Sequence, residues 1–333
     1  MKDNNSQRIA YWDNLKAILI FLVVLGHFLL PVSPKTGVVF SVYTWIYLFH
    51  MPAFVFVSGY FAKRYVDKGA TDEKKLIGFL VLYVLFSAAI WIIRMIYNHD
   101  ISMIFLFTAS GAPWYLLCMF MWYCLIPHCA KVRPIAMITV SITVGLLVGL
   151  EWQAGSFLAL SRFFVFFPFF LFGYHFDFLW IKNAKPFLKI ISAILLILVF
   201  ILICLFPHFF ASHTKVIYGD SAYTNMVWGL IERFIWYITA GILVSAFLFV
   251  IPQKRYFFTY IGQRTLAIYI LHRLMRDICQ YLGFYEMFSS SGPITFIACF
   301  IISIIITVVF STKKITELFS VAFSMEYRFL LKK

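Results

Sequence analysis

Ten long apolar runs dominate this sequence and restrict its fold more than any other feature. They lie near residues 12–30, 38–62, 76–97, 113–130, 133–150, 157–179, 187–206, 228–251, 257–283 and 293–311. A helix of about 20 apolar residues spans the hydrocarbon core of a bilayer and satisfies its own backbone hydrogen bonds there. We therefore expect an all-α integral membrane protein with about ten transmembrane helices, in which residues 1–333 form a single polytopic domain.

The composition excludes a soluble protein. Only 13% of the residues are charged and 63% are hydrophobic, including 40 phenylalanines. A soluble domain takes about 25% of its residues from the four charged types, and even a very large soluble core needs a charged shell around it. We therefore expect a multi-pass protein of the cell membrane, with the lipid bilayer as its surroundings.

The basic residues predict the orientation of the chain. With a cytoplasmic N-terminus, 19 of the 28 lysines and arginines fall in cytoplasmic segments, and two, Lys35 and Lys215, fall outside. Cytoplasmic loops are enriched in these residues, so we expect both termini in the cytoplasm and an even number of spans. The formal net charge of +14 follows from this bias, and we expect no nucleic-acid partner.

The remaining basic residues fall inside the expected spans, where a charge near the bilayer centre costs about 2.5–3.5 kcal/mol. They are Lys16, Arg94, Arg162, Arg233, Arg264, Arg273 and Arg276. Snorkelling explains Lys16 and Arg264, which lie near helix ends, while pairing with Glu232 or another acid explains Arg233, and pairing with Asp277 or another partner explains Arg276. The alternative is that these charges line a functional cavity.

Two of the expected helices carry polar stripes. In the first helix, Asp13, Lys16 and His27 share one face, with Lys16 and His27 about 16 Å apart along the axis. A second stripe runs along the ninth span at spacings of three and four residues: Gly262, Thr265, Tyr269, His272 and Arg276. A polar stripe on an apolar helix faces protein or water, so we expect both stripes to face the protein interior.

Other spans add polar and aromatic groups. The second span contains His50 before Pro52, which frees a backbone carbonyl, and Ser58 before Gly59, which permits close helix approach. The sixth span begins with Arg162 and the aromatic run 163–170, and the fourth begins with Trp114 and Tyr115, for which a place in the interfacial aromatic belt is the ordinary alternative. With a cytoplasmic N-terminus, both His27 and His272 fall in the outer half of the membrane. These features predict a polar cavity that opens toward the outer half.

The residue types in this cavity favour proton transfer and anion binding. Histidine takes and returns a proton near neutral pH, and arginine donates to phosphates, carboxylates and developing oxyanions. A proton-coupled transporter uses the same groups, so the residues alone leave both classes open. The six cysteines have the spacing of neither a zinc site nor a redox pair, and we expect no metal.

The segment RIAYWDNLKAILIFLVVLGHFL resembles the start of the acyltransferase-3 family, membrane enzymes that O-acylate surface polysaccharides. In the family's opening motif ten residues separate an arginine or lysine from a histidine, as they separate Lys16 from His27 here. Residues 48–61 resemble the branch related to fucose 4-O-acetylases and to the modifier/exporter of poly-N-acetylglucosamine adhesins. Residues 113–120, 162–174 and 261–272 resemble later family segments in the same order.

The resemblance implies acyl transfer, with acetyl as the expected group, from cytoplasmic acetyl-CoA to a hydroxyl of a carbohydrate or lipid-linked glycan. Acetyl-CoA is then a co-substrate, and no bound cofactor is expected. The resemblance makes His27 the general base or a transient acyl carrier, and Asp13 and Lys16 its charged partners. The residues expected at the substrate or donor site are His50, Ser58, Trp114, Tyr115, Arg162, Tyr269, His272 and Arg276. Many family members have arginine where this chain has Lys16, and a lysine lacks arginine's bidentate grip on an anion.

Two other functions use the same cavity. A polysaccharide exporter or proton-coupled transporter would use His27 and His272 as proton carriers, although the sequence lacks the internal repeat common in secondary transporters. A receptor or scaffold is a third alternative. Covalent label in a glycan incubated with labelled acetyl-CoA distinguishes the enzyme from the exporter.

Overall fold

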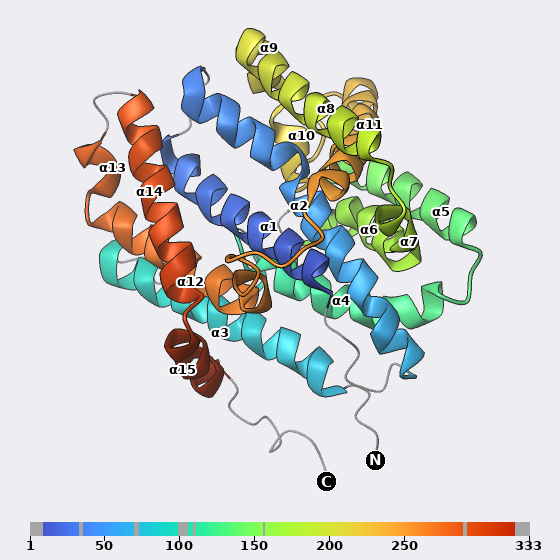
Figure 1. The fold of residues 1–333 in the computed structure, drawn as a ribbon, viewed down its shortest axis with the longest axis horizontal. Helices are drawn as coiled ribbons and strands as arrows, with labels where there is room; N and C mark the ends of the chain where they lie inside the picture. The colour runs from blue at the N-terminus through green and yellow to red at the C-terminus, as the bar shows by residue number, and fades with distance from the viewer. Residues whose placement is uncertain are drawn as a thin grey trace.

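The computed structural model describes residues 9–32, 36–69, 73–98, 106–108, 111–155, 157–288 and 292–323. Within these residues the chain is helical, and an isolated antiparallel bridge between Thr108 and Phe157 is the one β-type pairing. The helices pack into a bundle in which α1 (Ala10–Leu29) contacts α2, α12 and α14 (Figure 1).

Every expected span contains a helix. Besides α1, these are α2 (Gly37–Asp67), α3 (Glu73–Asn98), α4 (Trp114–Cys129), α5 (Pro134–Leu147), α6 (Leu160–His175), α8 (Pro186–Leu205), α11 (Met226–Val250), α12 (Thr265–Tyr281) and α14 (Gly292–Phe310). Among the described residues, six helices are long and apolar enough to cross a membrane, namely α1, α2, α3, α8, α11 and α14. Helices α4, α5 and α6 are apolar but shorter, and α12 has 17 residues. The chain is a multi-pass membrane protein, and the number of ten crossings stays a prediction.

The ninth expected span is shorter than its apolar run. The run begins near residue 257, but α12 begins at Thr265, and the preceding residues form turns and the short 3-10 helix η4 (Ile261–Gln263). A Cβ added at Gly262 would lie 1.8 Å from the carbonyl oxygen of Asp13. The backbone of this segment therefore packs directly against the start of α1, a contact that hydropathy does not reveal.

Several short helices connect the longer ones. The long connection 207–227 contains α9 (Pro207–His213) and α10 (Lys215–Tyr218), while α7 (Leu179–Lys182) and α13 (Phe284–Met287) follow α6 and α12. Helix α15 (Lys313–Phe323) follows α14, and the 3-10 helices η1 (Leu30–Val32) and η3 (Val148–Leu150) extend α1 and α5. The sequence patterns did not predict these elements, because most of them are too short to carry a hydrophobic period.

The first turns of α1 are tied to the segment between α11 and α12. The side-chain amide of Asn14 donates to the carbonyl oxygens of Pro252 at 2.9 Å and Lys254 at 2.8 Å. The Thr259 hydroxyl donates to Asn14 Oδ1 at 2.6 Å. Asn14 is fully buried, so these bonds satisfy its amide in the core and fix α1 against the loop.

The same end of the bundle gathers the ends of other helices. Arg264 Nη1 donates to the carbonyl oxygen of Ser311, after α14, at 2.6 Å, so this residue is held by a backbone acceptor. The Trp12 ring stacks on Tyr60 of α2 with 3.9 Å between centroids. We call this end of the bundle the Asn14 end and the other the cavity end. That the Asn14 end faces the cytoplasm stays a prediction from the charge distribution.

Helices α2 and α6 cross with their backbones in contact. A Cβ added at Gly59 of α2 would lie 1.9 Å from the carbonyl oxygen of Phe170, and one added at Gly173 of α6 would lie 1.8 Å from that of Phe56. The close approach expected at Gly59 is therefore confirmed. Each helix thus places a glycine against the backbone of the other helix. A shift of either helix would disturb both contacts at once.

Candidate functional site

A polar cavity of about 330 Å³ lies at the cavity end, between α1, α2, α4, α6 and α10. Four expected site residues line it, namely His27, His50, Trp114 and Arg162. Its other lining residues are Leu30, Tyr47, Met51, Gly111, Phe166, Ile217, Tyr218 and Asp220. We call it the histidine cavity. A larger hollow near α8 and α11 is lined by apolar and hydroxyl side chains without a histidine, acid or base, so it lacks the groups for proton transfer.

Two histidines from helices far apart in the sequence meet beside this cavity. The rings of His27 and His272 lie 5.1 Å apart between centroids, at an interplanar angle of 62°. His272 Nδ1 lies 2.8 Å from the carbonyl oxygen of Ile268, so this nitrogen carries the proton in neutral His272 and Nε2 is the acceptor. Within the described residues, His27 Nδ1 and His272 Nε2 are buried without a hydrogen-bond partner.

His50 forms a further part of the cavity wall. Its Nδ1 lies 2.8 Å from the carbonyl oxygen of Ile46, one turn earlier in α2, and this bond fixes the tautomer. The ring of Tyr47 approaches it edge to face at 4.7 Å between centroids. These two contacts fix the orientation of the His50 ring. Its other ring nitrogen, Nε2, takes no part in the bond to Ile46.

Three other expected residues form a row behind the cavity wall. The hydroxyls of Ser58 and Tyr115 lie 2.5 Å apart, and the ring of Tyr115 lies 5.6 Å from that of Tyr269 between centroids. Tyr269 donates to the carbonyl oxygen of Ala112, and its ring lies 6.1 Å from that of His272. The row links α2 and α4 to His272, but these side chains are not part of the cavity lining.

Asp13 and Lys16 lie at the opposite end of α1 from His27. Lys16 Nζ forms an ion pair with Asp13 Oδ1 at 3.0 Å, and Gln263 Nε2 donates to Asp13 Oδ2 at 3.2 Å. The structure therefore pairs these two charges with each other and does not bring them into the histidine cavity. Their role as partners of His27 stays a prediction.

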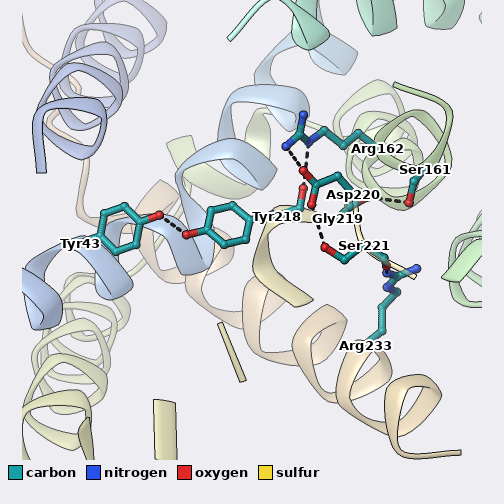
Figure 2. Close-up of polar contacts among 8 residues, drawn as sticks. All are labelled: Tyr43, Ser161, Arg162, Tyr218, Gly219, Asp220, Ser221 and Arg233. Atoms are coloured by element: carbon teal, nitrogen blue, oxygen red, sulfur yellow. Dashed lines mark hydrogen bonds and ion pairs between the residues drawn. The ribbon is translucent and has the colours of Figure 1, made fainter. Parts of the chain in front are cut away.

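The Arg162 side chain holds the loop 218–221 against the cavity (Figure 2). Its Nε donates to the carbonyl oxygen of Tyr218 at 3.1 Å, and its Nη2 pairs with Asp220. Ser161 donates to the carbonyl oxygen of Gly219 at 2.8 Å, and Gly219 has φ +65°, a conformation that favours glycine. The loop is thus fixed by two consecutive residues of α6.

Arg233 of α11 holds the same loop from its other side (Figure 2). Its Nη2 donates to the carbonyl oxygen of Ser221 at 3.1 Å. Its Nη1 donates to the carbonyl oxygen of Gly145 at 3.1 Å. The suggested pairing with Glu232 is therefore wrong, because Glu232 lies 3.5 Å from His213 instead. An arginine beside an acid in a helix points about 100° away from it, and here backbone carbonyls are its acceptors.

Tyr218 and Asp220 are cavity residues that the sequence patterns did not single out. Burial raises the pKa of Tyr218, so its hydroxyl stays protonated near neutral pH, and it forms a hydrogen bond with the hydroxyl of Tyr43. The one sequence signal for this position is the pair Gly219-Asp220 inside the longest connection, because such pairs mark turns.

The aromatic run of α6 packs mainly into the core. The Trp122 ring lies 5.3 Å from Phe170, and Trp114 stacks on Phe166 at 5.1 Å. Of the residues from 163 to 170, Phe166 is the one in the cavity lining. The guanidinium of Arg162 lies 5.4 Å from the Trp114 ring centroid, so Trp114 supports this charge by a cation–π contact.

We expect Arg162 and Asp220 to act as one unit. Arg162→Gln and Asp220→Asn should each speed amide hydrogen exchange in residues 218–221, because each breaks the same ion pair. The double variant should exchange about as fast as the faster single variant, with a coupling energy in the range of about 0.5–3 kcal/mol. Arg133→Gln, at an exposed residue before α5, is the matched control. If the effects of the two substitutions on hydrogen exchange were strictly additive, Arg162 and Asp220 would not act as one unit.

The described residues contain no group of three or more His, Cys, Asp or Glu side chains placed to hold a metal ion. All six cysteines are free thiols in the structure. The histidine cavity itself offers imidazoles, a guanidinium, a carboxylate, hydroxyls and aromatic rings.

Comparison with known proteins gives one match. A family model for an acyltransferase domain, acyltransferase-3, matches residues 9–312. No curated protein and no solved structure matches the chain. The matched range includes α1 and α12, which carry His27 and His272, and every lining residue of the cavity.

Proposed function

This chain belongs to the acyltransferase-3 family, and from this we propose that it is a membrane O-acyltransferase that acylates a sugar hydroxyl of a cell-surface or exported polysaccharide. We propose acyl-CoA as the donor, with acetyl-CoA as the expected form, and no resident cofactor. The observation that carries the proposal is the pair His27–His272, with 5.1 Å between ring centroids, in which His27 lines a polar cavity.

In the proposed reaction His27 accepts the proton of the acceptor hydroxyl. The oxygen then forms a bond to the thioester carbonyl carbon, the carbon–sulfur bond breaks, and the protonated imidazole returns its proton to the CoA thiolate. A positioned histidine of this kind accelerates such a step by about 10²–10⁴-fold. In the alternative route His27 first carries the acyl group on a ring nitrogen, and both routes need the same unprotonated imidazole.

His272 supports the base by defining its tautomer. Because the Ile268 carbonyl holds the His272 proton on Nδ1, Nε2 of His272 is an acceptor. It shares no hydrogen bond with His27 Nδ1 in the described structure, and we propose that the two atoms form one when substrate binds, with the proton on His27 Nδ1. In neutral His27 this leaves the lone pair on Nε2, where it is available to the substrate. We therefore propose His272 as a positioning residue for His27.

The cavity has features of a sugar site. Its volume of about 330 Å³ is at the lower end of the roughly 300–1,000 Å³ usual for small-molecule sites. Trp114 and Tyr47 offer aromatic faces, which suit the apolar faces of sugar rings, and Tyr218 and His50 offer polar groups. We propose that the Asn14 end faces the cytoplasm, so that the donor enters from the lysine-rich side and the acceptor from outside.

Acyl transfer is tested with the purified full-length protein and acetyl-CoA labelled in its acetyl group. We expect covalent label in a polysaccharide or sugar acceptor, removable by mild base as an ester is. Reconstituted vesicles that move an unmodified polysaccharide across the bilayer, with no label in any acceptor, would favour the exporter and contradict the enzyme.

A further inference from the structure

Two arginines share one carboxylate at the cavity end of α12, and a third arginine lies near them. Arg273 Nη1 pairs with Asp277 Oδ1, and Arg276 Nη2 lies 2.7 Å from the same oxygen. Arg94 of α3 lies close enough to act electrostatically on both arginines. We call Arg94, Arg273 and Arg276 the arginine cluster. Within the described part of the chain, Asp277 is the one acid in an ion pair with the cluster, which leaves a positive excess.

Arg273 and Arg276 of the cluster are buried together with Asp277, and some polar atoms at this place have no partner in the described chain. Arg273 and Asp277 are each 5% exposed, and Arg276 is 8% exposed. In the part of the chain that the structure describes, Arg276 Nε, Asp277 Oδ2 and the Tyr285 hydroxyl are buried without a hydrogen bond. Unsatisfied buried groups are costly, so this arrangement is typical of a site that receives a polar ligand.

The cluster borders the histidine cavity. Arg276 follows His272 by one turn of α12, on the same face. A Cβ added at the cavity residue Gly111 would lie 3.7 Å from Arg273 Nη2. The cavity residue Tyr47 interacts electrostatically with both Arg273 and Arg276. The cluster therefore lies directly behind the cavity wall at Gly111 and Tyr47, and its arginines are not among the residues that line the cavity.

The dipole of α12 explains only part of the charge. The C-terminal end of a helix carries roughly half a negative charge, and it stabilises cations mainly within its last turn. Helix α12 ends at Tyr281, more than one turn after Arg276. Three guanidiniums exceed what this dipole and Asp277 offset together.

We propose that the arginine cluster is an anion subsite that binds a phosphate or carboxylate group of the acceptor. Guanidiniums bind both groups through paired N–H donors, and in the described chain Arg276 Nε and the Tyr285 hydroxyl are buried donors without a partner. The acceptor class is thus a glycan with an acidic sugar or a sugar attached through phosphate. The inference rests on the proposed acyl transfer, and it assigns the anion to the acceptor because the donor is proposed to enter from the Asn14 end.

Binding is measured by calorimetry on the full-length protein in neutral detergent, with His27→Ala as the background so that no transfer occurs. The probes are N-acetylglucosamine 1-phosphate against N-acetylglucosamine, and glucuronate against glucose. We expect at least one anionic probe to bind about tenfold or more tightly than its neutral counterpart.

Arg94→Gln and Arg276→Gln should remove most of this preference. The control is Arg255→Gln, at an exposed arginine at the other end, which should preserve it. Arg94 is half-buried and has no ion pair within 4 Å in the described chain, so its variant keeps the test usable if Arg276→Gln does not fold.

Three results would overturn the assignment. The first is that the His27→Ala protein with all three arginines intact binds anionic and neutral sugars equally tightly. The second is weaker binding of coenzyme A, with unchanged sugar-phosphate binding, in Arg94→Gln and Arg276→Gln, since that would give the anion to the donor. The third is an effect of these variants limited to vesicles of phosphatidylglycerol, which would make the ligand a lipid headgroup. Anion binding without any transfer by the unsubstituted enzyme would contradict the proposed reaction while leaving the subsite intact.

Discussion

Replacement of His27 by alanine is expected to lower acyl transfer by about 10²–10⁴-fold, which is the usual contribution of a general base. If His27 carries the acyl group, we expect the rate of transfer to fall further. The protein should still insert and fold, because His27 Nδ1 makes no hydrogen bond in the described structure and its ring lines a cavity. Transfer is measured as label moved from acetyl-CoA to the acceptor, and folding as the thermal transition of the purified protein.

The matched control is His128→Ala. His128 is an exposed histidine near the end of α4, away from the cavity lining, and its loss should leave transfer unchanged. Full acylation by His27→Ala would end the proposed mechanism, whatever the behaviour of His272. A loss of transfer accompanied by a large drop in the thermal transition would instead point to a structural role for His27.

The substitution Gly59→Ala should strongly destabilise the fold. The new methyl would lie 1.9 Å from the carbonyl oxygen of Phe170, and a backbone atom cannot rotate away as a side chain does. Overpacking of a core costs about 1–3 kcal/mol, and we expect the upper part of this range, with a lower thermal transition and less folded protein in detergent. Gly173→Ala should behave alike, because it meets the carbonyl oxygen of Phe56 at 1.8 Å.

Gly241→Ala provides the control for this substitution. Gly241 lies inside α11, and a Cβ added there meets nothing within 4 Å, so the change should leave stability the same or raise it slightly through helix propensity. Equal stability of the Gly59 and Gly241 variants would show that α2 and α6 do not cross with their backbones in contact.

The sequence predicted the helices well, for a physical reason. Lipid forces each crossing segment to be apolar and helical, so the hydropathy of the chain alone located a helix in each of ten runs. Hydropathy gave the wrong helix start where a segment is apolar but does not form a spanning helix. Phe257 and Phe258 extend the ninth run, but the chain there forms turns, and Gly262 packs against the backbone of Asp13.

The candidate site was predicted in part. Polar residues in apolar helices need a partner or a cavity, and this rule identified His27, His50 and Arg162, which the structure places in one cavity. The same rule also selected Asp13 and Lys16, which satisfy each other at the Asn14 end. A stripe along one helix face shows that residues face inward, but it does not say which neighbour each of them meets.

Sequence by itself determined that this chain is a helical membrane protein, which residues face its interior, and through its motifs which family it resembles. Only the tertiary structure decided that His27 meets His272, that Arg162 and Arg233 hold the loop 218–221 beside the cavity, and that Arg94 lies near two arginines of α12. Hydropathy and spacing act within a single helix, whereas these contacts join segments of the chain that are far apart. They depend on how the helices pack, and close contacts such as those at Gly59 and Gly262 set that packing.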